Sequence, residues 1–92
     1  MAVGIIYDFK GATLDQYDQV VEKMDLGGKS YPGSLFHWVA GTDDGIRVVD
    51  VWEDRAQFDA FGEEKVGPIT QEVGLPNPPT VEEFQIHNIL TR

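Results

Sequence analysis

A histidine and an aspartate stand in an otherwise apolar stretch of this chain. His37 and Asp50 belong to segment 36–54, FHWVAGTDDGIRVVDVWED, in which two apolar runs flank an acidic turn. This pattern predicts a β-hairpin. A charged carboxylate among aliphatic side chains is costly without a partner, so Asp50 needs a hydrogen-bond partner or a chemical role. An aspartate next to an imidazole can orient the ring and stabilise its protonated form, as general acid–base catalysis requires.

The turn of the predicted hairpin decides which residues pair. If Asp43-Asp44 is the loop, His37 lies opposite Asp50. If Asp44-Gly45 is the loop, in a type I′ turn, His37 lies opposite Trp52 and Asp50 is its diagonal neighbour. A three-residue loop would break the pairing. Both two-residue loops place the following residues on one face: Leu35, His37, Val39, Ile46, Val48, Asp50 and Trp52.

The two faces of this hairpin differ in polarity. Apart from Arg47, the face without His37 is apolar, and we predict that it packs against helices; it carries Phe36, Trp38, Ala40, Val49 and Val51. The face with His37 is then predicted to line a cavity on the other side of the sheet. The residues expected to contact a substrate there are Trp52, Val48, Val39 and Leu35, with Ile6 from the first strand and His87 from the last.

The elements around the hairpin follow the order β-α-β-β-α-β. We predict strands over residues 2–9, 35–41, 46–53 and 81–90. One helix begins with a Thr13–Gln16 capping box and ends at Gly27-Gly28. A second begins with a capping box at Asp54 and ends near Gly74, with a kink near Gly67 because Pro68 follows.

This order predicts a ferredoxin-like α+β fold, an antiparallel sheet with two helices on one face. Right-handed crossovers further predict that the first and third strands are neighbours and run parallel. The other sheet face, predicted to carry Leu35, Val39, Val48 and Trp52, is bare, so we expect a homodimer to cover it.

Composition narrows the class of protein. The 92 residues suit one domain, 1–92. Seven Lys and Arg against sixteen Asp and Glu give a net charge of −9, which argues against nucleic-acid or anionic-membrane partners. The chain has no cysteine, no apolar run long enough to span a membrane and no signal peptide, so we expect a cytoplasmic protein. The spacing of His37, His87 and Asp50 does not demand a metal, and we predict none.

Two motifs carry a resemblance to a known family. The hairpin followed by VVDVWEDRAQFDAF (residues 48–61), with YPG (31–33) before it, resembles the dimeric α+β barrel superfamily, specifically the antibiotic-biosynthesis-monooxygenase-like (ABM) domains. The resemblance implies a homodimer with facing sheets and a pocket lined by Trp52. Haem-degrading members have a pocket asparagine near Gly4 and a histidine on the second helix. This chain has neither, so no cofactor is expected.

Two functions follow from these features. The first is a cofactor-independent monooxygenase for an aromatic or polyketide-like substrate, in which His37, assisted by Asp50, removes a proton and Trp52 stacks on the ring. An isomerase or cyclase would use the same residues. The alternative is a non-catalytic dimeric binding or accessory protein, in which the His37–Asp50 pair is only structural.

Overall fold

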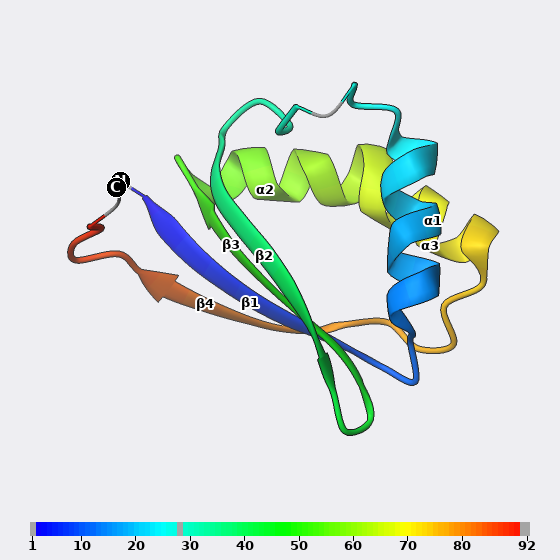
Figure 1. Ribbon diagram of the computed structural model, residues 1–92. Helices are drawn as coiled ribbons and strands as arrows, with labels where there is room; N and C mark the ends of the chain where they lie inside the picture. Colours follow the sequence, from blue (N-terminus) through cyan, green and yellow to red (C-terminus); the bar gives the residue numbers. More distant parts are fainter. Residues whose placement is uncertain (1, 28, 91–92) are drawn as a thin grey trace.

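The computed structural model, which describes residues 2–27 and 29–90, has one sheet with helices packed on one of its faces (Figure 1). Gly28, part of the predicted helix end, lies outside the described residues. The strands are β1 (Val3–Lys10), β2 (Ser34–Thr42), β3 (Gly45–Trp52) and β4 (Thr80–Gln85). The helical segments are α1 (Leu14–Met24), α2 (Arg55–Phe61), the π-helical turn η1 (Gly62–Val66) and α3 (Gly67–Val73). The predicted ferredoxin-like order is confirmed.

The strand order is β2-β3-β1-β4, and each neighbouring pair is antiparallel. The first and third strands are neighbours, as predicted, but the prediction that they run parallel was wrong. The crossover through α1 makes β2 parallel to β1, and the hairpin then reverses the chain. Strand β3, inserted between them, must therefore oppose both. The last strand also ends earlier than predicted, at Gln85.

Helix α1 begins as predicted and ends earlier. The Thr13 side chain accepts from the Gln16 amide, and the Gln16 side chain accepts from the Thr13 amide, so both halves of the capping box form. The helix ends at Met24 because Asp25 adopts a left-handed conformation, with φ of 52°. Its buried side faces the sheet through Val20 and Met24.

The second helical segment follows the prediction with two differences. Asp54 caps α2 by accepting from the Gln57 amide, but the Gln57 side chain donates to Glu53, so the predicted capping box is only half formed. The kink takes the form of η1, the wide turn that precedes Pro68 and accommodates a residue without an N–H. In the part of the chain that the structure describes, no helix is both long and apolar enough to cross a membrane.

The helix-covered face of the sheet holds the core. The alternate β1 residues Val3, Ile5, Tyr7 and Phe9 face the helices, as predicted. Their β3 partners share that face, because Val3 pairs with Trp52, Ile5 with Asp50 and Tyr7 with Val48. The predicted faces of β2 and β3 were therefore wrong. The core consists of Val3, Ile5, Tyr7, Phe9, Ala12, Val20, Met24, Ile46, Val48, Trp52, Phe61 and Ile69.

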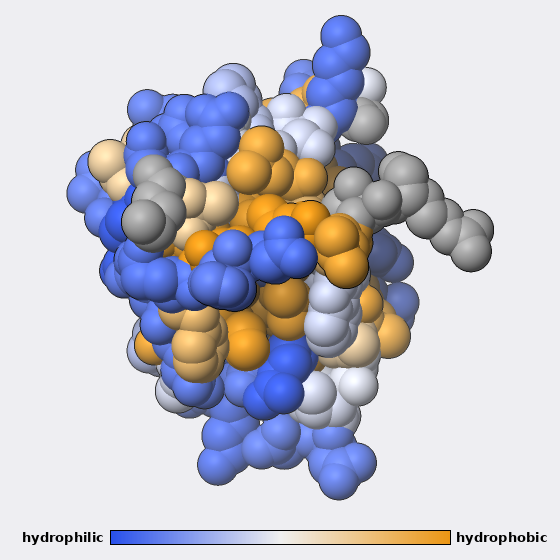
Figure 2. All heavy atoms as spheres, turned by 90° about the vertical axis from the view of Figure 1, so that its left-hand side faces the viewer, coloured by the Kyte–Doolittle hydropathy of each residue, from blue (hydrophilic) through white to orange (hydrophobic). Residues whose placement is uncertain are grey.

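The opposite face of the sheet is open and apolar at its centre. Figure 2 shows hydrophobic side chains gathered there with hydrophilic ones around them. Trp38, predicted to lie in the core, is 43% exposed on this face, and Phe36 and Phe84 are 48% and 49% exposed. The half-buried Ile6 and Val49 pair between these rings. The bare face exists as predicted, but with the other set of side chains.

Candidate functional site

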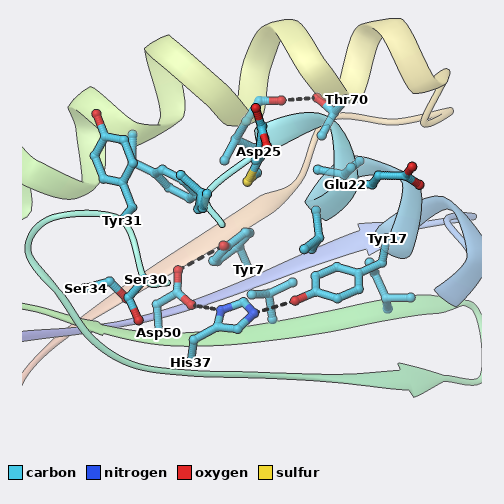
Figure 3. Close-up of a pocket in the computed structure, with 18 of the residues that line it drawn as sticks. Tyr7, Tyr17, Glu22, Asp25, Ser30, Tyr31, Ser34, His37, Asp50 and Thr70 are labelled. Carbon is cyan, nitrogen blue, oxygen red and sulfur yellow. Dashed lines mark hydrogen bonds and ion pairs between the residues drawn. The ribbon is translucent and has the colours of Figure 1, made fainter. Parts of the chain in front are cut away.

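His37 and Asp50 form a direct pair in the middle of the β2–β3 hairpin. They are cross-strand partners, and Thr42 pairs with Gly45, so the register with Asp43-Asp44 as the loop is confirmed. His37 Nδ1 lies 2.5 Å from Asp50 Oδ1 (Figure 3). Asp50 is 1% exposed, whereas the His37 side chain is 39% exposed. The carboxylate therefore lies deep, and the imidazole links it to the solvent-accessible side.

Two further donors hold the Asp50 carboxylate. Its Oδ2 accepts from the Tyr7 hydroxyl at 2.9 Å and from Trp52 Nε1 at 3.1 Å. Burial, and then the charge of Asp50, raise the pKa of Tyr7 well above its usual value, so this hydroxyl remains a donor. Indole N–H groups only donate. A buried acceptor that meets donors on both oxygens is the condition under which a carboxylate is tolerated in a core.

The chain of polar contacts continues from His37 to Tyr17 on α1. The Tyr17 hydroxyl lies 2.6 Å from His37 Nε2, and the two rings lie end to end through this contact, with centroids 6.1 Å apart and planes at 14°. Burial first, then the charges of Asp50 and Asp18, raise the pKa of Tyr17. With a neutral imidazole, Nδ1–H donates to Asp50 and Nε2 accepts from Tyr17.

The sequence pattern does not mark the two tyrosines as site residues. Tyr17 has the helical spacing of the buried Val20 and Met24, and Tyr7 alternates with aliphatic β1 residues, so both fit the pattern of core side chains. The feature that could have placed Tyr7 and Tyr17 in the site was the hydroxyl group of each side chain. A tyrosine hydroxyl on a buried face usually finds a hydrogen-bond partner, and in this sequence Asp50 and His37 are the polar side chains that fall in the same layer.

The network borders a cavity of about 510 Å³ between the sheet, α1, the end of the second helical segment and the loop before β2 (Figure 3). This volume is in the range of small-molecule sites. The loop side is formed by Tyr31, whose ring packs 4.8 Å from that of Phe61 and whose hydroxyl donates to Glu64 at 2.5 Å. The wall is largely apolar and includes Val20, Met24, Ile46, Val48, Trp52 and Leu75.

The residues expected at the site are only partly together. His37, Asp50, Trp52 and Val48 line the cavity. Val39 packs against the core beside it. Leu35 is 52% exposed at a β-bulge between Ser34 and Phe36, Ile6 lies on the open face, and His87 is exposed beyond β4. The expectation that the cavity lies on the side away from the helices was wrong, because Asp50 pairs with Ile5 on the helix-covered face.

The geometry suits proton transfer. A proton that arrives at His37 Nε2 makes an imidazolium, and the adjoining buried Asp50 carboxylate stabilises that charge. Tyr7 and Trp52 prevent the carboxylate from turning away. Within residues 2–27 and 29–90, no group of three His, Asp or Glu side chains is placed to hold a metal ion.

Solved structures share this fold along almost the entire chain. No family model matches the chain, and no curated protein matches its sequence. A candidate antibiotic biosynthesis monooxygenase from Chloroflexus aurantiacus is 22% identical, with 99% of this chain and 98% of that chain covered and a TM-score of 0.69. SnoaB, a cofactor-independent oxygenase from Streptomyces nogalater, is 14% identical, with coverage of 99% and 97% and a TM-score of 0.63. A dimeric ferredoxin-like protein of unknown function from Thermobifida fusca is 15% identical, with coverage of 94% and 92% and a TM-score of 0.65. The chain therefore has the ferredoxin-like fold of antibiotic-biosynthesis-monooxygenase-like domains.

Proposed function

We propose that this protein is an enzyme that begins its reaction by removing a proton from a small aromatic or polyketide-like molecule, and that it acts as a cofactor-independent monooxygenase. The observation that supports this most is the Tyr17–His37–Asp50 chain, which leads from a buried carboxylate to an apolar cavity. The fold shared with SnoaB, a cofactor-independent oxygenase, supports the same reaction class.

The chemistry needs only the substrate and dioxygen. His37 accepts a proton from an activated CH₂ group, and Asp50 stabilises the imidazolium. The electron-rich carbanion gives an electron to O₂, and the two radicals combine to form a C–O bond. The proton on His37 then completes a hydroperoxide, which loses water to leave a carbonyl. In sum, CH₂ and O₂ become C=O and H₂O, and the substrate supplies all four electrons. Trp52 lines the cavity but is only 1% exposed, so it would act by holding the Asp50 carboxylate through its indole N–H rather than by stacking on the substrate.

An isomerase or cyclase would share the first step, and a binding protein would share the cavity. An unfilled cavity of about 510 Å³ favours a ligand-binding role over a purely structural one. The buried carboxylate with its exposed imidazole favours catalysis over binding alone, because a binding site gains little from a proton acceptor held in this way.

We also propose that the chain is a homodimer in which the open sheet faces of two copies pack together. The half-exposed Phe36, Trp38 and Phe84 form an apolar centre that a monomer of 92 residues would leave in water. The similarity in fold to a protein described as dimeric and ferredoxin-like supports this arrangement. Trp38 and its neighbours would then be buried, and the cavity on the other face would stay free.

Oxygen uptake with a dihydroxyanthrone tests the reaction. We expect the enzyme to consume one O₂ for each quinone formed and the rate to fall in His37→Gln and Asp50→Asn. Asp43→Asn is the matched control, because it makes the same chemical change in the exposed turn of the same hairpin. Deuterium exchange into the substrate under nitrogen, without O₂ uptake in air, would indicate an isomerase or cyclase. Binding without exchange or oxidation would indicate the accessory protein and refute the catalytic proposal.

A further inference from the structure

Both ring nitrogens of His37 are already engaged. Nδ1 contacts Asp50 at 2.5 Å and Nε2 contacts the Tyr17 hydroxyl at 2.6 Å. A substrate that gave its proton directly to Nε2 would first have to displace that hydroxyl. Tyr17 and His37 both line the cavity (Figure 3), but the oxygen that a substrate proton can reach without breaking a contact of His37 belongs to Tyr17.

Displacing Tyr17 would disturb more than one hydrogen bond. Its ring lies end to end with the imidazole, with the two planes 14° apart, and its backbone belongs to α1, which is anchored to the sheet by the buried Val20 and Met24. A side chain held by a hydrogen bond and by a docked helix keeps its position at low energetic cost. The hydroxyl is thus preorganised between the substrate space and His37.

We infer that Tyr17 is the catalytic residue that takes the proton from the substrate, while its own hydroxyl proton passes to His37 Nε2. This inference rests on the proposed function and changes the role of His37. His37 then receives its proton from Tyr17 instead of directly from the substrate. The O–H bond of Tyr17 breaks as a new one forms from the substrate proton, so Tyr17 ends as a neutral phenol. His37 becomes an imidazolium beside Asp50, and the substrate carries the negative charge. No electron transfer is involved in this step.

The surroundings of Tyr17 favour a concerted exchange of the two protons. Burial and the carboxylates of Asp50 and Asp18 raise its pKa, so a free tyrosinate is disfavoured and the hydroxyl is protonated at rest. If the substrate proton arrives as the hydroxyl proton leaves, no tyrosinate accumulates. The new positive charge then forms on His37, next to the opposite charge of the Asp50 carboxylate.

The same charges restrict the substrate. Besides Asp50, the cavity lining includes the carboxylates of Glu22 and Asp25, against the single ammonium group of Lys29 among the described lining residues. An anion would meet this excess of negative charge, so the ligand should enter neutral and lose its proton inside. The class that fits is a neutral molecule whose acidic hydrogen, on an activated CH₂ group or on a phenol, reaches the Tyr17 oxygen.

Binding of 4-nitrophenol tests this step without any oxygenation. At a pH below the pKa of the free phenol, binding to the parent protein should produce the yellow nitrophenolate absorption. Tyr17→Phe keeps the ring and removes the hydroxyl, so it should bind nitrophenol in the neutral, colourless form. His37→Gln should do the same, and the Tyr17→Phe/His37→Gln double variant should be no worse than either single variant, since the two residues act as one unit.

The outcomes separate this inference from the proposed function. If Tyr17→Phe ionises nitrophenol as the parent does, His37 takes the proton directly and the inference fails while the proposed function stands. If the parent oxidises the anthrone, kcat should fall about 10²-fold or more in Tyr17→Phe, and an unchanged kcat overturns the inference. A parent protein that neither ionises nor binds the phenol and takes up no O₂ with the anthrone overturns both. Circular dichroism establishes that each variant is folded before the comparison is made.

Discussion

Asp50→Ala should destabilise the protein more than Asp50→Asn, because the two substitutions leave different groups without partners. Alanine removes the acceptor for the Tyr7 hydroxyl and for Trp52 Nε1, which are 5% and 1% exposed as residues. Asparagine keeps the shape, and its carbonyl oxygen can accept from both. Its NH₂ group must then face His37 Nδ1, which forces the imidazole into the tautomer with the proton on Nε2.

The size of each effect follows from burial. A buried donor left unsatisfied costs about 1–3 kcal/mol, so two of them give a loss of about 2–6 kcal/mol in Asp50→Ala. His37 adds little, because its side chain is 39% exposed and can turn to water. In Asp50→Asn the hydrogen bonds remain but lose their charge, which costs about 1–2 kcal/mol. A domain of this length has a total stability of about 5–14 kcal/mol, so the difference should be easy to measure.

Asp50→Asn should have a large effect on activity although its effect on stability is small. The Asp50→Asn variant stays folded, but its His37 Nε2 carries a proton and cannot accept another. We expect kcat to fall on the order of 10³–10⁴-fold, as when the aspartate of a serine-protease triad becomes asparagine. Urea unfolding followed by circular dichroism gives the stabilities, and nitrogen NMR of the imidazole gives the tautomer. Equal stability of the two variants, or an unchanged tautomer in Asp50→Asn, would refute the network as described.

Three further predictions concern other parts of the fold. Trp38→Asp, on the open face, should convert a homodimer into monomers by light scattering, and an unchanged mass would show that this face is not the interface. Burial and Asp50 raise the pKa of Tyr7 in the folded protein. The stability that the protonated Tyr7 hydroxyl contributes is therefore complete below its unfolded pKa of about 10 and is lost as pH rises through its folded pKa. The unfolding free energy of Tyr7→Phe should depend less on pH in the alkaline range. The hydrogen bonds from Arg47 lower the pKa of Asp8, so that pair stabilises the fold above the unfolded value of about 3.9, and its contribution is lost as pH falls through the folded value. Asp8→Asn should remove this acid dependence, by a small amount because both side chains are partly in water, and an identical acid midpoint with identical slope would contradict it.

Local features of the sequence predicted local structure well. The capping box at Thr13 depends on residues three apart, and the pairing of His37 with Asp50 is one of the two registers that a two-residue turn allows. The need of Asp50 for a partner was also visible, since a carboxylate among aliphatic residues is costly wherever it lies. These inferences required no knowledge of which elements meet across the fold.

The faces of the hairpin could not be assigned in this way. Both faces of β2 and β3 are largely apolar, one with Val48 and Trp52 and the other with Trp38 and Val49, so polarity alone does not distinguish core from open face. The deciding fact is the pairing of β3 with β1, more than 40 positions earlier, which places Asp50 beside Ile5. A sheet with one face on helices and the other suited to a second copy has two apolar faces by construction.

The environment of Asp50 explains why the helix-covered face is the right one for it. Trp52, two residues along β3, shares that face and donates its indole N–H, and Tyr7, diagonal to Asp50 on β1, donates its hydroxyl. On the open face the neighbouring side chains would include Ile6, Trp38 and Val49. Along β1 and β3 they provide no pair of hydrogen-bond donors comparable to Tyr7 and Trp52. The mixture of aromatic and polar residues that suggested a cavity therefore correctly marked the hairpin face that borders one. Its donors are also what allow the carboxylate to be buried beneath helices, where α1 adds Tyr17 and completes the path from Asp50 to the cavity.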